Sequence, residues 1–217
     1  MFLSLPEEVY NTMRWKLPWF FKHGKSQDLW LDTELVVVDL ELTGLDAAEH
    51  EVVSVAWVMI KRGKIVLAES RYMLNRSVQH LSQSPVFHGI DETQLEQGHD
   101  IEVIMSELAK ALEGRVLVCH NILLDWSFIK KAFLEMGIVT RPTQMLDTLK
   151  IEKSRLLRQH QAVIQDQLRL PVCRARYGLP NYQNHNALSD ALATAELLLA
   201  QVNHFDSEKH IKLSALL

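Results

Sequence analysis

The apolar and polar residues of the chain alternate between short β-rich runs and helical stripes. The first run, residues 35–46 (LVVVDLELTGLD), has three valines after a leucine and then carboxylates, which predicts a buried strand reaching an open sheet edge. Residues 51–60 and 65–74 are two further β-rich runs, and the polar link between them contains a glycine, a hairpin signal. The three runs predict an antiparallel meander.

Helical spacing of apolar residues appears after this meander. It covers residues 100–112, where Asp100 is placed to cap a helix and Gly114 to end it. Residues 115–119 then form a short apolar strand, and residues 177–202 contain a second apolar stripe at helical spacing. This order of strands and helices predicts an α/β protein with a mixed sheet, although residues 150–177 are polar and irregular.

A chain of 217 residues with 47% hydrophobic content is long enough for one substantial core. We therefore expect an aromatic and basic N-terminal extension at residues 1–33, a main domain at residues 34–205 and a C-terminal tail at residues 206–217. Two cysteines are too few for a disulfide framework, the N-terminus does not read as a secretory signal, and no apolar run is long enough to span a bilayer. A cytoplasmic protein without a membrane span is the expectation.

The net charge of −4 argues against a broad basic surface that coats nucleic acid. This charge is compatible with an enzyme that binds one strand end in a small acidic site filled by metal ions. Between Lys150 and Arg176, seven Lys or Arg residues accompany two acidic residues, so this stretch is either a solvated helix face or a track for a phosphate backbone.

An aromatic cluster with flanking Lys and Arg residues lies in the N-terminal extension. Either it packs back onto the main domain, or it serves a partner, a membrane surface or a nucleic-acid strand. The cluster consists of Trp15, Trp19, Phe20 and Phe21.

Two carboxylates end the first predicted strand. Asp39 and Glu41 are two residues apart, so both side chains point to the same face of an extended backbone. Like charges held side by side repel, and a cation between them relieves the repulsion, which suggests a divalent-metal site. The alternative is an edge strand with a solvated acidic end.

Two more carboxylates follow at the starts of predicted helices. Asp125 lies where a strand gives way to a helix, a position that suits either a ligand site or a helix cap. Asp190 lies beside alanines near the start of the last helix, where an unpaired carboxylate is costly. His185, five residues earlier, can reach the same site from a loop.

Taken in order, these residues resemble the three motifs of the DEDDh 3′-to-5′ exonucleases, the DnaQ-like family that includes the proofreading epsilon subunit of bacterial DNA polymerase III. The tyrosine subclass has a Tyr four residues before the final Asp, where this chain has Asn186. The resemblance extends from about Leu35 to Val202, and the residues that carry it are Asp39-x-Glu41 with Thr43-Gly44, His120-Asn121 with Asp125, and His185 with Asp190.

The resemblance implies a ribonuclease H-like α/β fold with a mixed five-stranded sheet flanked by helices. It implies that two Mg²⁺ ions, for which Mn²⁺ can substitute, are held by Asp39, Glu41, Asp125 and Asp190. His185 is the expected general base. The remaining expected substrate contacts are Leu42, Thr43, Gly44, His88 and Asn121.

The implied activity is release of nucleoside 5′-monophosphates from a nucleic acid with a free 3′ end, single-stranded DNA being favoured, in a role such as proofreading or repair. One alternative is an RNA 3′-end exonuclease or oligoribonuclease of the same superfamily. Another is a polymerase-associated binding module, and a polymerase or other protein partner is a candidate for the N-terminal extension.

Overall fold

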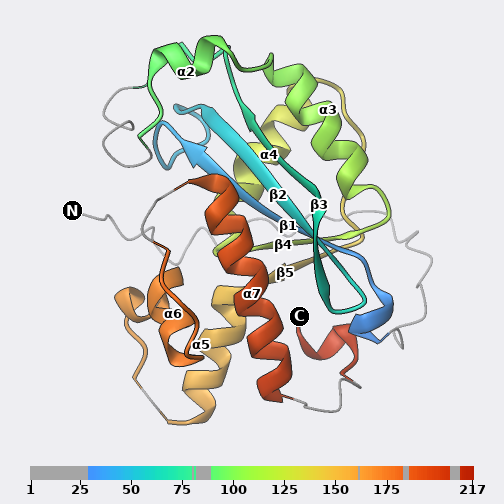
Figure 1. The fold of residues 1–217 in the computed structure, drawn as a ribbon, viewed down its shortest axis with the longest axis vertical. Coiled ribbons are helices and arrows are strands. Elements are labelled where there is room, and N and C mark those ends of the chain that lie inside the picture. Colours follow the sequence, from blue (N-terminus) through green and yellow to red (C-terminus); the bar gives the residue numbers. More distant parts are fainter. Residues whose placement is uncertain (1–28, 80, 82–88, 161, 183–185, 206–210) are drawn as a thin grey trace.

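The computed structural model describes residues 29–79, 81, 89–160, 162–182, 186–205 and 211–217. Its centre is a mixed five-stranded sheet with the strand order β3-β2-β1-β4-β5 (Figure 1). The first three strands are antiparallel, whereas β4 and β5 run parallel to β1. This confirms the predicted mixed α/β sheet, whose strands are β1 (Leu35–Leu42), β2 (Val52–Lys61), β3 (Lys64–Leu74), β4 (Val116–Cys119) and β5 (Gln144–Asp147).

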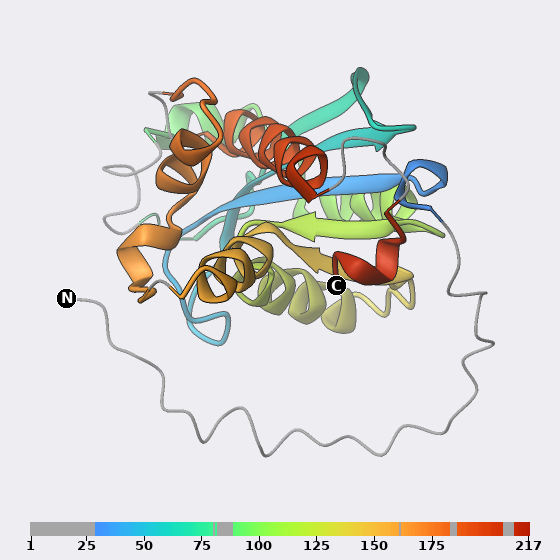
Figure 2. The same ribbon diagram turned by 90° about the horizontal axis from the view of Figure 1, so that it is seen from below.

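Helices cover both faces of the sheet (Figure 2). α3 and α4 pack on one face, and α7 packs on the other. The described helices are α2 (Glu92–Glu96), α3 (Ile101–Leu112), α4 (Ile122–Glu135), α5 (Thr148–Arg158), α6 (Leu170–Arg176) and α7 (Ala187–Phe205), with 3-10 turns η2 (Trp30–Asp32), η3 (Gln165–Leu168) and η4 (Leu213–Ala215). None of these helices is both long enough and apolar enough to cross a membrane.

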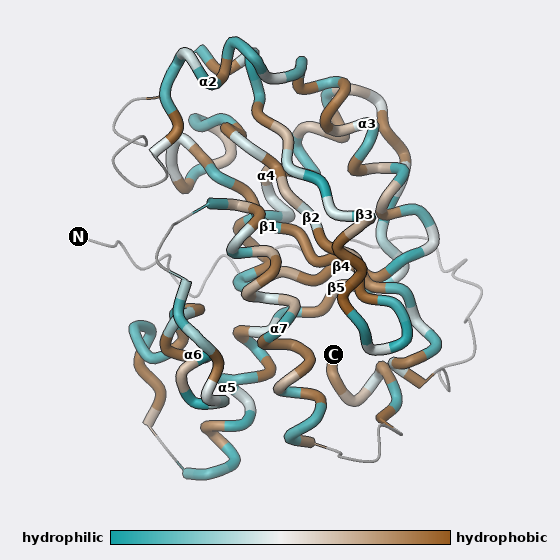
Figure 3. Tube along the Cα trace, viewed as in Figure 1, coloured by the Kyte–Doolittle hydropathy of each residue, from teal (hydrophilic) through white to brown (hydrophobic). Residues whose placement is uncertain are grey.

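The run of valines in β1 is explained by burial on both faces of the strand. Val36 and Val38 belong to the core beneath α3 and α4, whereas Leu35 and Val37 belong to the core beneath α7. Figure 3 shows the resulting band of hydrophobic residues through the middle of the sheet. Because side chains alternate along a strand, the next odd-numbered positions of β1 also point toward α7.

The link between β2 and β3 is the predicted hairpin. Lys61 pairs with Lys64, and the two residues between them, Arg62 and Gly63, have φ values of 51° and 68°. Two positive φ values are typical of the two-residue turns that match the twist of the strands.

Alanines on α7 let this helix approach the sheet closely. Ala187, Ala191 and Ala195 are fully buried in the same core cluster as Val37 and Ala56. Their small side chains bring the helix backbone near the strands, and with it the first turn of α7.

Asp100 is the N-cap residue of α3, as expected, but its side chain makes no cap hydrogen bond. The Asp100 carboxylate pairs instead with Arg76 at 2.6 Å. Arg76 follows the end of β3. The Asp100 carboxylate therefore pairs with a side chain distant in the sequence and not with a backbone N–H of α3. Gly114 has a φ of 71° just after the helix, as expected for its end.

Residues 150–177, which the sequence did not align with the family pattern and for which one interpretation was a helix face, are largely helical. They contain most of α5 together with η3 and α6. Glu152 is fully buried in α5 and forms ion pairs with Arg155 and Arg176, and its carboxylate also accepts a hydrogen bond from the Tyr177 hydroxyl. Part of the basic character of this stretch is therefore used inside the protein, neither solvated nor presented to a phosphate backbone.

The two ends of the described chain meet. Trp30 in η2 is buried, and its backbone N–H donates to the Ile211 carbonyl at 3.0 Å. Leu213 and Leu216 are buried in the same cluster as Trp30, so residues 211–217 pack against the core beneath α7. The aromatic cluster of the N-terminal extension lies outside the described residues.

Candidate active site

Two carboxylates reach the site from β1. Asp39 and Glu41 continue the alternation of Leu35 and Val37, so both point to the α7 side of the sheet. In the register of β1 and β2, Glu41 lies opposite Ser54, and a bulge follows between Glu41 and Leu42. The strand therefore loses its regular pairing directly after the two acidic residues, as is common beside functional sites.

α7 contributes the third carboxylate. Asp190 lies in its first turn, and the Asp190 backbone N–H donates to the Asn186 carbonyl at 2.9 Å. Carboxylate oxygens of Asp39, Glu41 and Asp190, one from each residue, all lie within 4.8 Å of one another, close enough to hold a metal ion. Residues that lie far apart in the sequence, on β1 and on α7, thus form one acidic cluster.

Asp125 comes to the same place from the other side of the sheet. It is buried in the first turn of α4, where the backbone N–H groups of Leu40 and of Asp125 itself favour its charged form. The cap position of α4 is Asn121, so the helix-cap interpretation of Asp125 was wrong. Asp125 is not one of the three clustered carboxylates, but its charge acts on Asp39.

The protonation of these carboxyl groups reflects their crowding. Burial raises the pKa of Asp39 well above its ordinary value, and the charges of Asp125, Asp190 and Glu41 raise it further. Burial also raises the pKa of Glu41 to about 7, with a second contribution from Asp190. The pKa of Asp125 is raised by burial too, although its N–H partners oppose the shift. A bound cation would reverse these shifts, because it favours the charged carboxylates.

The loop that follows β1 is held by contacts among its own residues. The Thr43 hydroxyl accepts a hydrogen bond from the Glu51 backbone N–H at 2.9 Å and lies 3.4 Å from His50 Nδ1. The His50 ring covers Gly44 so closely that a Cβ there would come within 2.3 Å of Nε2. Of the predicted substrate contacts, Leu42, Thr43 and Gly44 directly follow Glu41 in the chain and are partly exposed, and the Leu42 side chain packs against the core beneath α3 and α4.

The other residues that the sequence assigned to the site differ in their surroundings. Asn121 is exposed in a left-handed conformation, with a φ of 77°, between β4 and α4, and its backbone N–H donates to Asp147 at 3.0 Å. His88 and His185 lie outside the described residues. His120 has both ring nitrogens engaged, with the Thr148 hydroxyl and the Leu168 carbonyl, each at 2.8 Å. Burial lowers the pKa of His120, so this histidine has a structural place beside the site.

Two residues near the site were not identified as site residues from the sequence. Asp147 ends β5, caps α5 through the Leu149 N–H, and its charge raises the pKa of Asp125. A carboxylate at the end of a parallel strand was its sequence signal. Tyr72 on β3 interacts with Asn186 and with the charge of Glu41, and burial raises its pKa. No sequence signal marked Tyr72, because its position depends on a register shift between β2 and β3.

Comparison with known proteins gives a family match over most of the chain. The model of the exonuclease family named RNase_T matches residues 36–198. The PolC-type DNA polymerase III of Caldanaerobacter subterraneus is 32% identical over 171 residues, covering 78% of this chain and 12% of the relative. The 3′-5′ exonuclease DinG of Staphylococcus haemolyticus is 30% identical over 175 residues, covering 80% of this chain and 19% of the relative. The chain thus spans less than a fifth of the length of these relatives.

Solved structures share the fold at low sequence identity. Escherichia coli exonuclease I in complex with a dT13 oligonucleotide has a TM-score of 0.66 at 14% identity, covering 81% of this chain and 43% of that one. A 3′-exonuclease solved with a histone mRNA stem-loop has a TM-score of 0.64 at 15% identity, covering 81% and 65%. These likenesses confirm the ribonuclease H-like fold. With the family match over residues 36–198, they show that the chain belongs to the exonuclease family.

Proposed function

We propose that this protein is a metal-dependent 3′-to-5′ exonuclease. The observation that carries the proposal is the convergence of Asp39, Glu41 and Asp190 within 4.8 Å, with Asp125 beside them, in a chain of the exonuclease family. A binding module has no use for carboxylates that repel one another in a partly buried place, whereas phosphoryl chemistry needs the cations that they hold. The relative DinG is named a 3′-5′ exonuclease, which supports cleavage in the 3′-to-5′ direction.

The donor set fits magnesium. Asp39, Glu41, Asp125 and Asp190 offer only carboxylate oxygens, which favour Mg²⁺ or Mn²⁺ over zinc. Three clustered carboxylates with a fourth beside them suit two divalent ions. When bound, such ions would neutralise the attacking and the leaving oxygens of an in-line displacement at phosphorus.

The chain's own residues supply the proton transfer and the orientation of the substrate. We assign the general base to His185, the residue before Asn186 in the sequence, because an unperturbed histidine with a pKa of roughly 6.5 suits proton transfer near neutral pH. It would take a proton from the attacking water. The terminal nucleotide would contact Leu42, Thr43, Gly44, His88 and Asn121. The Thr43 hydroxyl accepts the Glu51 N–H and lies beside His50 Nδ1, so the loop that would meet the substrate is held by its own hydrogen bonds.

The proposed substrate is a 3′ end of single-stranded nucleic acid, with DNA favoured. The relatives that match by sequence include a DNA polymerase, and exonuclease I binds an oligodeoxynucleotide. The fold neighbour that recognises a histone mRNA stem-loop keeps an RNA 3′ end as the alternative substrate. The similarity to PolC-type DNA polymerase III supports a proofreading or repair role and a polymerase partner. The two free cysteines, Cys119 and Cys173, support a cytoplasmic location.

The first test is cleavage of 5′-labelled single-stranded DNA and RNA of one sequence in Mg²⁺. We expect a ladder that shortens from the 3′ end, faster with DNA, and no ladder with a chelator or with Asp190→Asn, because one metal ligand is lost. Asp166→Asn is the matched control, since Asp166 is exposed on η3. Full activity of Asp190→Asn would contradict the metal site, and faster cleavage of RNA would favour the alternative substrate.

The second test concerns the base. We expect His185→Ala to lower kcat by roughly 10²- to 10⁴-fold and to flatten the acidic limb of the pH–rate profile, because the proton acceptor is removed. His99→Gln, at an exposed histidine, serves as the control and should behave as the wild type. An unchanged rate and pH profile for His185→Ala would remove His185 from the mechanism.

The third test concerns pH and stability. A carboxyl group with a raised pKa binds its proton more tightly in the folded protein than in the unfolded chain. The metal-free protein should therefore lose stability as pH rises from about 5 to about 8, and Mn²⁺ should raise Tm more at the higher pH, where the ligands are charged. Glu41→Gln should flatten this slope, because its pKa of about 7 lies in that range.

Thermal unfolding with and without Mn²⁺ measures both effects. Histidines also titrate in this range, so the quantity to compare is the difference between wild type and Glu41→Gln. Equal slopes for the two proteins would show that Glu41 is not the crowded group that the geometry indicates.

A further inference from the structure

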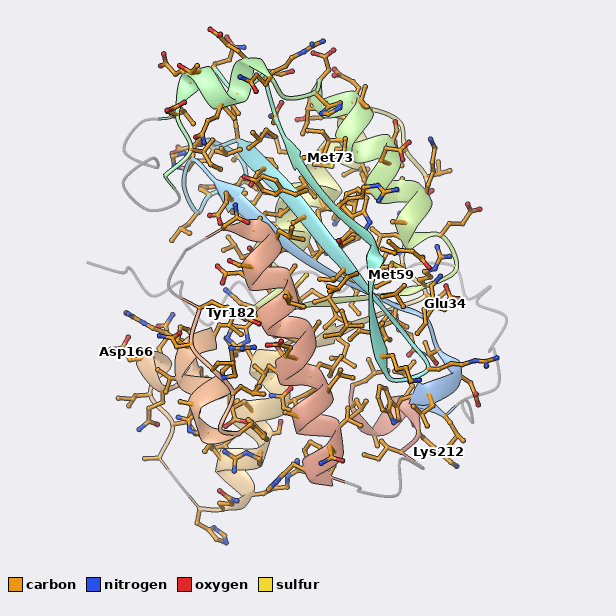
Figure 4. The ribbon with its side chains drawn as sticks, viewed as in Figure 1. Glu34, Met59, Met73, Asp166, Tyr182 and Lys212 are labelled. Carbon is orange, nitrogen blue, oxygen red and sulfur yellow. The ribbon has the colours of Figure 1, made fainter. Side chains whose placement is uncertain are left out.

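A cavity outside the acidic site lies beside β5, the last strand on that side of the sheet, and we call it the β5 cavity. Its volume is about 390 Å³, at the small end of the range for ligand pockets. The start of α4, one face of α5 and the segment that follows Lys212 (Figure 4) form its walls. Its apolar lining includes Ile122, Leu123, Trp126, Met145, Phe205 and Leu217.

Four of these apolar side chains are exposed to solvent. Leu123 is 51% exposed and Leu217 is 57% exposed, and Met145 and Phe205 are exposed as well. Large apolar side chains that gather at one exposed place are uncommon on a protein without a partner, and they mark interaction sites. The described part of the chain thus leaves these four side chains without a full cover.

α5 lines the cavity with polar side chains. Lys150, Ser154 and Arg158 are four residues apart, so they form one stripe along the helix, and all three belong to the lining. The Arg158 guanidinium lies over the Phe205 ring, 5.1 Å from its centroid, which holds this cation beside the apolar wall. The β5 cavity therefore combines an apolar wall with a cationic one.

The two cations of the lining are free to bind a ligand. Lys150 and Arg158 have no carboxylate partner among the residues that the structure describes. Asp147 is the acidic residue of the lining, and one of its carboxylate oxygens accepts two backbone N–H groups. Apart from the exposed Lys153, the other basic residues between positions 150 and 176 pair with carboxylates of the protein, and they are Arg155, Arg169, Arg174 and Arg176.

We propose that the β5 cavity is a docking site for a protein partner, which binds through a peptide segment that combines bulky apolar side chains with acidic ones. The apolar side chains would pack against Leu123, Trp126 and Met145, and the carboxylates would pair with Lys150 and Arg158. This binding activity goes beyond the proposed exonuclease activity and does not depend on it.

Charge distinguishes this occupant from two others. The aromatic cluster of the chain's own N-terminal extension is flanked by Lys and Arg residues, so Lys150 and Arg158 would repel it. A nucleic-acid strand binds to a series of cations and to open aromatic faces. The cavity offers two cations, and Arg158 already covers the Phe205 ring. An acidic and apolar peptide makes use of both kinds of wall.

The chain contains a matched control for each kind of wall. Lys153 is exposed on α5 but does not line the cavity, so Lys153→Glu repeats the charge reversal of Lys150→Glu nearby. Leu134 is 67% exposed on α4, the helix that carries Leu123, and lies outside the lining. Leu134→Ser therefore serves as the control for Leu123→Ser. Because all four residues are exposed, the four variants should fold and cleave DNA as the wild type does.

The experiment selects binders of the full chain from a displayed library of short random peptides. The affinity of the most enriched peptide, made synthetically, is then measured by fluorescence anisotropy. Enriched peptides should combine Asp or Glu with large apolar residues. Lys150→Glu and Leu123→Ser should each weaken binding of the selected peptide about 10-fold, because one reverses a complementary charge and the other removes an apolar contact. Lys153→Glu and Leu134→Ser should keep the wild-type affinity.

Several results would overturn this assignment. One is the absence of acidic peptides from the selection, and another is equal affinity of Leu123→Ser and Leu134→Ser for the selected peptide. Weaker binding of labelled single-stranded DNA by Lys150→Glu, with peptide binding unchanged, would instead indicate a nucleic-acid site. A wild-type dimer that Leu123→Ser dissociates would indicate a second copy of the chain as the occupant. An inactive wild-type enzyme would refute the exonuclease proposal without affecting peptide binding, so the two failures are distinguishable.

Discussion

Carboxylates that are held together in a partly buried pocket lose hydration and repel one another, so the surrounding fold has to hold them there against that cost. Asp39, Glu41 and Asp190 are in this situation, with Asp125 close by. The raised pKa values of Asp39 and Glu41 are its direct expression. A cation converts this repulsion into attraction, which is why an otherwise unfavourable arrangement suits metal-dependent chemistry.

The elements that hold the carboxylates in place are packed into the hydrophobic core. β1 is buried on both faces, so the alternation that packs its valines also fixes the direction of Asp39 and Glu41. The alanines of α7 bring its first turn, with Asp190, against the sheet. Hydrophobic packing on both sides of β1 thus supplies the free energy that keeps like charges together.

The sequence predicted the features that depend on local periodicity. The direction of Asp39 and Glu41 followed from strand alternation, and Asp125 and Asp190 followed from the starts of helices. What it missed depends on pairing between distant residues. The Asp100 carboxylate binds Arg76 and makes no side-chain bond to its helix, and basic residues after Lys150 pair with the buried Glu152, where the sequence offered a solvated face or a phosphate track.

The same reason explains the polar residues that were overlooked around the site. The position of Tyr72, for example, depends on a register shift between β2 and β3, which no spacing rule predicts. Charged and aromatic side chains of this kind show their function only through their contacts.

The central claim is that the four carboxylates hold divalent cations for phosphodiester hydrolysis. Its most direct test is anomalous diffraction from crystals grown with Mn²⁺ and a nucleoside 5′-monophosphate. We predict two manganese peaks among Asp39, Glu41, Asp125 and Asp190, separated by about 4 Å, with the phosphate between them. Manganese bound elsewhere, or no peak beside these carboxylates, would contradict the account.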